Sequence, residues 1–175
     1  LWPHYFVAEK VNAKKKIAWI HTDFSTIETN IEEDLRIWNK FDNIVAVSEE
    51  CKNSFLNKYP SLKNKVSVIE NITSPEFIKK MSQEDIEQEI INDTSFKLIS
   101  VARLSHAKGI DNAVKVLRVL KDRGLDNIKW YVVGYGGDEE IIKSLIKENN
   151  LEDNFILLGK KINPYPYMKV GDIYV

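Results

Sequence analysis

Short apolar runs of strand length alternate along the chain with segments whose apolar residues recur at helical spacing. Amphipathic helices are expected at residues 30–40 and 110–124, because apolar side chains return there every three or four positions. A further helix is expected to start at residues 138–140, which are acidic, with Ile141, Ile142, Leu145 and Ile146 on its buried side. The strand-length runs are continuously apolar, as in strands buried on both faces of a parallel sheet. The predicted strands are residues 17–20, 43–47, 65–69, 96–101, 128–133, 155–158 and 171–175. This alternation predicts an α/β protein.

The alternation breaks near Asn71, where residues 70–75 are polar and rich in turn-forming types. Beyond this break, residues 82–85 resemble a capping box and predict a polar helix that runs to about Ile91. The break divides the strands into two groups. We therefore expect two Rossmann-like halves that face each other across a cleft.

Polar, basic or glycine residues stand where the predicted strands end. In an open parallel sheet these carboxyl ends share one edge, and ligands bind there. The residues at strand ends are His21, Ser48, Asn71, Arg103, Gly134 and Gly159. Ser48 also precedes two glutamates, so it is expected to cap a helix that runs to about residue 57. The recurrence predicts ligand sites along the carboxyl edge.

Arg103 and Lys108 lie between a predicted strand and a helix that begins at Ile110. Taken singly, Arg103 could be a surface ion-pair partner and Lys108 a solvated loop charge. Together with the free N–H groups of a helix start, a forked guanidinium and a mobile ammonium suit a dianionic diphosphate. The arrangement as a whole favours a phosphate site.

The glycine cluster at residues 134–137 invites comparison with the dinucleotide-binding fingerprint. That fingerprint fails, because Glu139 stands where a third glycine is required. A phosphate-binding P-loop fails too, because no glycine stands five residues before Gly109. What remains is a tight turn, which either lets a ligand approach the backbone closely or serves only as a turn.

Composition excludes several classes of function. The 175 residues carry a net charge of −1, which gives no reason to expect a nucleic acid partner. A single cysteine, Cys51, rules out an internal disulfide or a cysteine-rich metal site. No bilayer-spanning apolar run or signal peptide is visible, so a cytoplasmic location is expected. The three consecutive lysines at residues 14–16 are expected to be solvated. Their positive charge also leaves open a peripheral contact with anionic lipid.

The segment Ala102-Arg103-Leu104, followed by residues 108–111, resembles a signature of the family 4 glycosyltransferases, which are retaining, nucleotide-sugar-dependent enzymes of the GT-B fold. The resemblance implies that Arg103 and Lys108 bind the donor diphosphate and that no metal or other cofactor is needed. Residues 19–23 look like the family segment that carries a histidine facing the donor sugar. His21 is therefore the implied catalytic residue, and its role is to position or polarise the reacting sugar and acceptor.

The same resemblance implies further nucleotide contacts at two turns. The family has a Val-Gly-x-Gly turn that lines the donor site, and Gly134 and Gly136 match it. The backbone after its Phe-x-x-x-Gly strand meets the nucleobase, and Lys161 and Ile162 match that position. These four residues complete the expected donor site.

The resemblance covers nearly the whole chain but only the middle of the family's length. Residues 1–71 match the end of the N-terminal, acceptor-side domain, residues 72–95 an interdomain linker with a helix, and residues 96–175 the first half of the donor-binding domain. Both Rossmann-like halves are therefore expected to be incomplete. A Glu-x7-Glu pair of the family falls in the missing part, so this fragment alone is expected to be inactive.

The implied activity is that of a hexosyltransferase-type glycosyltransferase, which moves a sugar from a nucleoside diphosphate sugar to a hydroxyl of a glycan or lipid-linked acceptor with retention. Its implied setting is cell-surface polysaccharide or glycolipid synthesis, in the cytoplasm or at the inner face of the membrane. A sugar-nucleotide epimerase of the same fold would instead alter the free donor without an acceptor. A noncatalytic nucleotide-sugar binding module would bind without turnover, and a plain phosphate-binding domain would show no preference among bases.

Overall fold

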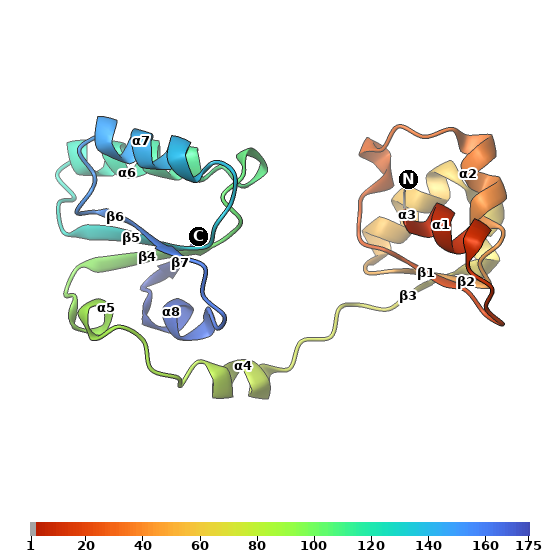
Figure 1. Ribbon diagram of the computed structural model, residues 1–175, viewed down its shortest axis with the longest axis horizontal. Helices are drawn as coiled ribbons and strands as arrows, with labels where there is room; N and C mark the ends of the chain where they lie inside the picture. The colour runs from red at the N-terminus through yellow and green to blue at the C-terminus, as the bar shows by residue number, and fades with distance from the viewer. Residues whose placement is uncertain (1–2) are drawn as a thin grey trace. The chain divides into compact units, whose positions relative to one another are not determined.

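A computed structural model describes residues 3–175, in two compact units that comprise Leu1–Thr73 and Ser74–Val175. Each unit contains one β-sheet whose paired strands are all parallel, with helices packed against it (Figure 1). The predicted α/β class with two parallel sheets is therefore confirmed.

The first unit contains a three-stranded sheet in the order β1-β2-β3. Its strands are β1 (Ile17–Ile20), β2 (Asn43–Ala46) and β3 (Val66–Val68). Its helices are α1 (Pro3–Lys10), α2 (Ile31–Trp38) and α3 (Glu49–Lys58), with 3-10 turns η1 (Phe24–Thr26) and η2 (Pro60–Lys65). All three predicted strands are present, whereas α1 was not predicted.

Aromatic side chains fill the core of this unit. The ring of Phe24 meets that of Phe55 edge to face at a centroid distance of 5.0 Å, and Trp38 meets Phe55 in the same way at 5.1 Å. Edge-to-face pairs at this separation add attraction beyond the area that they bury. Trp38 is therefore a core residue. The Ser48 hydroxyl accepts a hydrogen bond from the Cys51 N–H at 3.2 Å, which confirms Ser48 as the cap of α3.

The second unit contains a four-stranded sheet in the order β6-β5-β4-β7. Its strands are β4 (Phe96–Val101), β5 (Ile128–Val133), β6 (Phe155–Gly159) and β7 (Ile173–Tyr174). The chain runs outward from β4 to β6 and then returns to the other side of β4. In doubly wound sheets, the crevice at such a reversal is where ligands bind. The loop that follows β4 borders this point.

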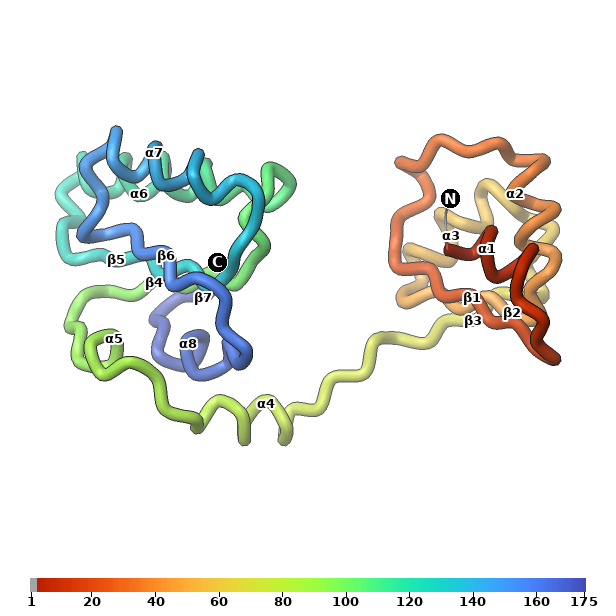
Figure 2. The backbone as a smooth tube through the Cα atoms, viewed as in Figure 1, coloured from red at the N-terminus to blue at the C-terminus, as the bar shows by residue number. Residues whose placement is uncertain are grey.

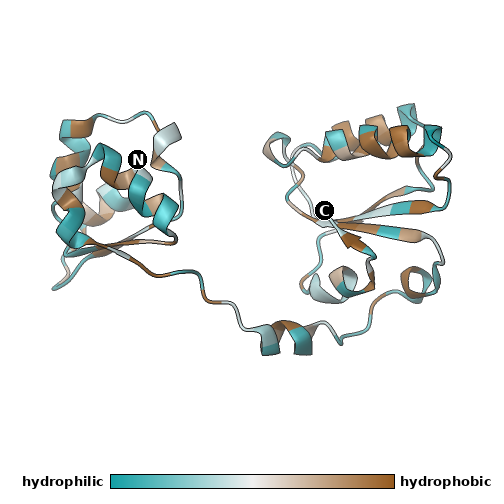
Figure 3. Cartoon of the chain, turned by 180° about the vertical axis from the view of Figure 1, so that it is seen from behind, coloured by the Kyte–Doolittle hydropathy of each residue, from teal (hydrophilic) through white to brown (hydrophobic). Residues whose placement is uncertain are grey.

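Helices cover both faces of this sheet. On one face lie α6 (Ile110–Asp122) and α7 (Glu139–Glu148), whose apolar residues pack on the strands (Figures 1 and 3). On the other face lie α5 (Gln88–Asn92) and α8 (Tyr165–Val170), which pack over a second apolar cluster (Figure 2). The sheet is therefore the middle layer of three. Its central strands β4 and β5 are largely buried, as their continuous apolar sequence predicts, whereas the edge strand β7 is exposed.

The segment after the first unit differs from the sequence prediction. Helix α4 (Pro75–Met81) begins directly after Ser74, whose hydroxyl caps it by accepting a hydrogen bond from the Phe77 N–H at 3.2 Å. Ser82 ends this helix: its N–H donates to the Ile78 carbonyl at 2.9 Å. The predicted capping box at residues 82–85 is therefore wrong, because Ser82 is a C-cap and the next helix, α5, begins only at Gln88.

Candidate functional site

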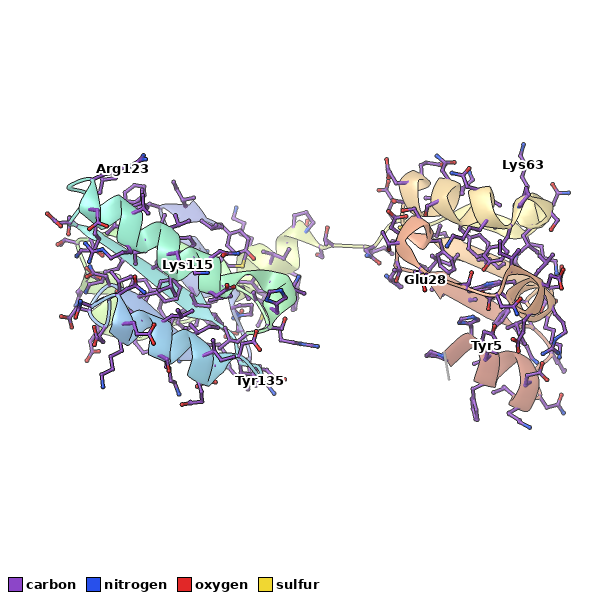
Figure 4. The ribbon with its side chains drawn as sticks, turned by 90° about the horizontal axis from the view of Figure 1, so that it is seen from above. Tyr5, Glu28, Lys63, Lys115, Arg123 and Tyr135 are labelled. Carbon is purple, nitrogen blue, oxygen red and sulfur yellow. The ribbon has the colours of Figure 1, made fainter. Side chains whose placement is uncertain are left out.

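A pocket of about 370 Å³ lies at the carboxyl edge of the second sheet. It is lined from three successive strand ends, by Val101, Ala102 and Arg103 at the end of β4, by Val133, Gly134 and Tyr135 at the end of β5, and by Lys160, Lys161 and Pro164 after β6. Tyr135 lies at the end of the unit opposite Arg123, the residue that follows α6 (Figure 4). The pocket therefore occupies the edge at which a parallel sheet binds its ligands.

The loops after β4 and β5 run side by side and are hydrogen-bonded to each other. The Ala102 N–H donates to the Val133 carbonyl at 3.0 Å, and the Leu104 N–H donates to the Tyr135 carbonyl at 3.0 Å. These two hydrogen bonds therefore fix the loop after β4 against the loop after β5. Arg103 lies between Ala102 and Leu104, so a backbone hydrogen bond on each side of it fixes the position of its backbone.

The close approach of these loops explains two glycines. A Cβ on Gly134 would lie 1.8 Å from the Ala102 carbonyl oxygen, and a Cβ on Gly136 would lie 2.1 Å from the Leu104 carbonyl oxygen. Both distances are far below van der Waals contact, so neither position can hold a side chain while the loops touch. Gly134 also lines the pocket, whereas Gly136 is absent from its lining. The neighbouring loop alone is sufficient reason for both glycines.

Two exposed cations near this edge have no side-chain partner among residues 3–175. Arg103 and Lys108 are exposed, and neither forms an ion pair or a side-chain hydrogen bond within residues 3–175. Lys108 lies in the 3-10 turn η3 (His106–Lys108), and α6 begins two residues later without a side-chain cap. Arg103 lines the pocket and Lys108 does not. Both charges, together with the first N–H groups of α6, are available to an anion.

The side chain of Lys161 has a structural role. Its ammonium lies 2.5 Å from a carboxylate oxygen of Glu87, and the Tyr167 hydroxyl donates to the other oxygen at 2.8 Å. The hydrogen bond from Lys161 is the main reason that the pKa of Glu87 falls to about 2. Lys161 therefore ties the loop after β6 to the segment before α5, and only part of this residue faces the pocket. Ile162 is fully exposed and lines a different hollow, beside Met81.

Sequence reasoning missed Lys160 and Tyr135, which both line the pocket. The Lys160 ammonium lies 5.2 Å from the centroid of the Tyr135 ring, a cation–π contact. Each residue directly follows a glycine that ends a strand segment. Attention to the residue after each strand-end glycine could have found both.

His21 follows β1 in the first unit, whereas the other candidates belong to the second unit. The His21 ring is exposed and stacks on that of Trp19 at a centroid distance of 6.2 Å. It lines a largely apolar pocket of about 290 Å³ formed by α1, β1, η1 and α2. The strand-end position predicted for His21 is therefore observed, and its catalytic role stays a prediction.

Within residues 3–175, no group of three or more histidine, cysteine, aspartate or glutamate side chains is placed to hold a metal ion. The helices in this part of the chain are also too short or too polar for any to cross a membrane.

Comparisons of sequence show which proteins this chain is similar to. A family model described as "Glycosyl transferases group 1" matches residues 81–175. The uncharacterized glycosyltransferase MJ1059 of Methanocaldococcus jannaschii is 27% identical over 136 residues, which is 77% of this chain and 33% of that protein. MJ1069 of the same organism is 27% identical over 97% of this chain and 46% of its own length. The amylovoran biosynthesis glycosyltransferase AmsK of Erwinia amylovora is 37% identical over 65 residues, which is 37% of this chain and 16% of that protein.

Comparisons of structure point to the same fold. The chain superposes on Anabaena HepE, solved in complex with UDP, with a TM-score of 0.66 at 20% identity, over 91% of this chain and 46% of that one. It superposes on a Staphylococcus aureus TarM mutant, solved with UDP and other ligands, with a TM-score of 0.64 at 17% identity, over 91% and 31%. These neighbours have the GT-B fold, which confirms the predicted fold class. The chain spans between a third and a half of the length of MJ1059 and MJ1069.

Proposed function

Because the chain belongs to the glycosyl transferases group 1 family, we propose that it provides the donor-binding half-site of a family 4 hexosyltransferase. In this proposal the enzyme moves a sugar from a nucleoside diphosphate donor to a hydroxyl of a glycan or lipid-linked acceptor, with retention. One observation carries the proposal: the exposed guanidinium of Arg103, which forms no ion pair or side-chain hydrogen bond within residues 3–175, lines a pocket at the carboxyl edge of the sheet.

The proposed chemistry is electrostatic. When the bond between the anomeric carbon and the diphosphate oxygen breaks, negative charge builds up on the leaving diphosphate. Arg103 binds two phosphate oxygens through its forked N–H groups, and Lys108 adds a second charge from the start of α6. Fixed positive groups aimed at developing charge lower the barrier without a metal ion. His21, from the acceptor-side unit, positions or polarises the reacting sugar and acceptor in this scheme.

The named relatives support a setting and a first donor to test. AmsK is a glycosyltransferase of amylovoran biosynthesis, and the HepE and TarM structures are complexes with UDP. We therefore propose a UDP-sugar as the first donor to examine and an envelope polysaccharide or glycolipid as the product class. The proposed location is the cytoplasm or the inner face of the membrane, where such donors and lipid-linked acceptors meet.

Calorimetric titration of the full-length protein with UDP, GDP and ADP tests the donor site. We expect one nucleotide to bind and its affinity to fall at least tenfold in Arg103→Ala and in Lys108→Ala, which is about 1.4 kcal/mol. Lys147→Ala is the matched control, because Lys147 is an exposed lysine of α7 outside the pocket lining and its loss changes the net charge equally. Equal affinities in wild type, Arg103→Ala and Lys108→Ala would refute the diphosphate role.

Turnover assays separate the alternatives. The proposed transferase requires an acceptor and leaves free nucleoside diphosphate. An epimerase would convert the donor sugar with no acceptor present, and a noncatalytic module would bind the nucleotide without converting it. Either result, obtained with the full-length protein, would contradict the transferase proposal and leave the phosphate site standing.

A further inference from the structure

Lys160 and Lys161 are adjacent in sequence and both line the pocket, but their ammonium groups have different partners. Lys161 is neutralised by Glu87 at 2.5 Å. Lys160 is exposed and forms no ion pair within the described residues, and its one close partner is the ring face of Tyr135. The charge of Lys160 is therefore not cancelled by any carboxylate of this part of the chain.

The pocket itself is electropositive. Its lining contains Arg103, Lys160 and Lys161 but no aspartate or glutamate. With Lys161 neutralised from outside the pocket, two charges remain, one after β4 and one after β6. The end of β5 lies between them in the sheet and contributes Gly134 and Tyr135. Two uncompensated cations on either side of a pocket favour an anionic ligand that reaches both strand ends.

We propose that Lys160 is a further phosphate-binding residue of this pocket and that Tyr135 holds its ammonium over the pocket until the ligand arrives. This inference rests on the proposed function, since the phosphate is that of the nucleoside diphosphate donor. An exposed cation–π contact is weaker than a charge-assisted hydrogen bond to phosphate. When phosphate binds, the Lys160 ammonium therefore leaves the Tyr135 ring and contacts the phosphate. Without ligand, the ring restricts the conformations of the Lys160 side chain.

Titration of the full-length protein with UDP, GDP and ADP at about 50 mM and about 500 mM salt tests this role, because salt screens a charge contact and leaves packing largely unchanged. We expect Lys160→Ala to lower the affinity for the bound nucleotide about tenfold at low salt, and much less at high salt. Lys160→Arg should retain most of the affinity. The control Lys147→Ala, outside the pocket lining, should bind as the wild type does.

The outcomes separate this inference from the proposed function. If Arg103→Ala weakens binding and Lys160→Ala does not, the donor site stands and the role of Lys160 is refuted. If Lys160→Ala weakens binding equally at both salt concentrations, Lys160 acts through packing, and the phosphate contact is refuted. If the wild-type protein binds none of the three nucleotides, the proposed function fails and this inference fails with it.

Discussion

Replacing Gly134 by alanine is expected to destabilise the second unit by about 3 kcal/mol, because the new methyl group would collide with backbone. Its position lies 1.8 Å from the Ala102 carbonyl oxygen and 3.0 Å from the carbonyl carbon. Both are backbone atoms, so neither can move aside by a rotamer change, whereas a side chain could. The loops after β4 and β5 must separate, which breaks the bonds that Ala102 and Leu104 donate to the β5 side. The measurement is the urea midpoint of the transition that unfolds this unit.

Gly137→Ala is the control for this prediction. Gly137 lies in the same turn, but a Cβ there meets no heavy atom within 4 Å, and its φ lies outside the range that disfavours a side chain. Its midpoint should stay close to that of the wild type, within about 0.5 kcal/mol. If the Gly134 and Gly137 variants unfold at the same urea concentration, the contact between the two loops does not hold them together as described.

The second large effect is expected at Asp93, which lies between α5 and β4. Its carboxylate accepts hydrogen bonds from the Tyr131 hydroxyl and, at 2.9 Å, from the Ser95 N–H, and it pairs with the Lys129 ammonium at 3.2 Å. Asp93→Asn keeps a similar shape but removes the charge that Lys129 faces. The Asp93 side chain is only 11% exposed. We therefore expect the substitution to lower the free energy of unfolding by about 2 kcal/mol at neutral pH.

The effect of this substitution should depend on pH with a defined sign. Burial alone would raise the pKa of Asp93, but the hydrogen bonds from Tyr131 and Ser95 outweigh it and hold that pKa below the usual range. A carboxyl whose pKa is lowered by folding stabilises the protein above the unfolded pKa of about 4 and loses this effect as the pH falls towards the folded pKa. The gap between wild type and Asp93→Asn should therefore narrow below about pH 4.

Urea midpoints at pH 7 and at pH 3 measure this gap. Asp153→Asn is the matched control, because Asp153 is exposed and has no ion pair among the residues that the structure describes. That variant should follow the wild type at both values of pH. A gap for Asp93→Asn that stays constant between them would show that the charge of Asp93 is not what stabilises this part of the sheet.

Strands β2, β4 and β5 could be predicted from sequence because they are largely buried on both faces, which leaves a continuous apolar run as a signal. Strand β1 is apolar throughout although Ile17 and Trp19 on one of its faces are exposed. Three helices could not be predicted, and proline explains two of these failures. Pro75 and Pro166 stand in the first turns of α4 and α8, where the missing N–H costs nothing. Because proline is also typical of turns and loops, the sequence around it does not predict a helix at either place. The third, α1, has almost no amphipathic pattern, so periodicity gave no signal there.

The candidate site divides in the same way. Loops at the carboxyl edge, and the position of Arg103 within one of them, follow from the strand pattern and residue types. The sequence does not tell which of Lys160 and Lys161 forms an ion pair, because the partner is Glu87, 74 residues from Lys161 along the chain. Local sequence also gives no sign that the glycines at 134 and 136 face another loop, since only the paired strands bring Ala102 and Leu104 beside them.

The ion pair between Lys161 and Glu87 has a consequence for chemical reactivity. Acylating reagents attack the neutral form of an amine. The hydrogen bond from Lys161 to Glu87 raises the pKa of that lysine, so its ammonium keeps its proton at alkaline pH, where ordinary lysines begin to react. A lysine-selective reagent should therefore modify Lys160 and spare Lys161. A label attached in this way to Lys160 leaves the ion pair between Lys161 and Glu87, which fixes the loop after β6, intact.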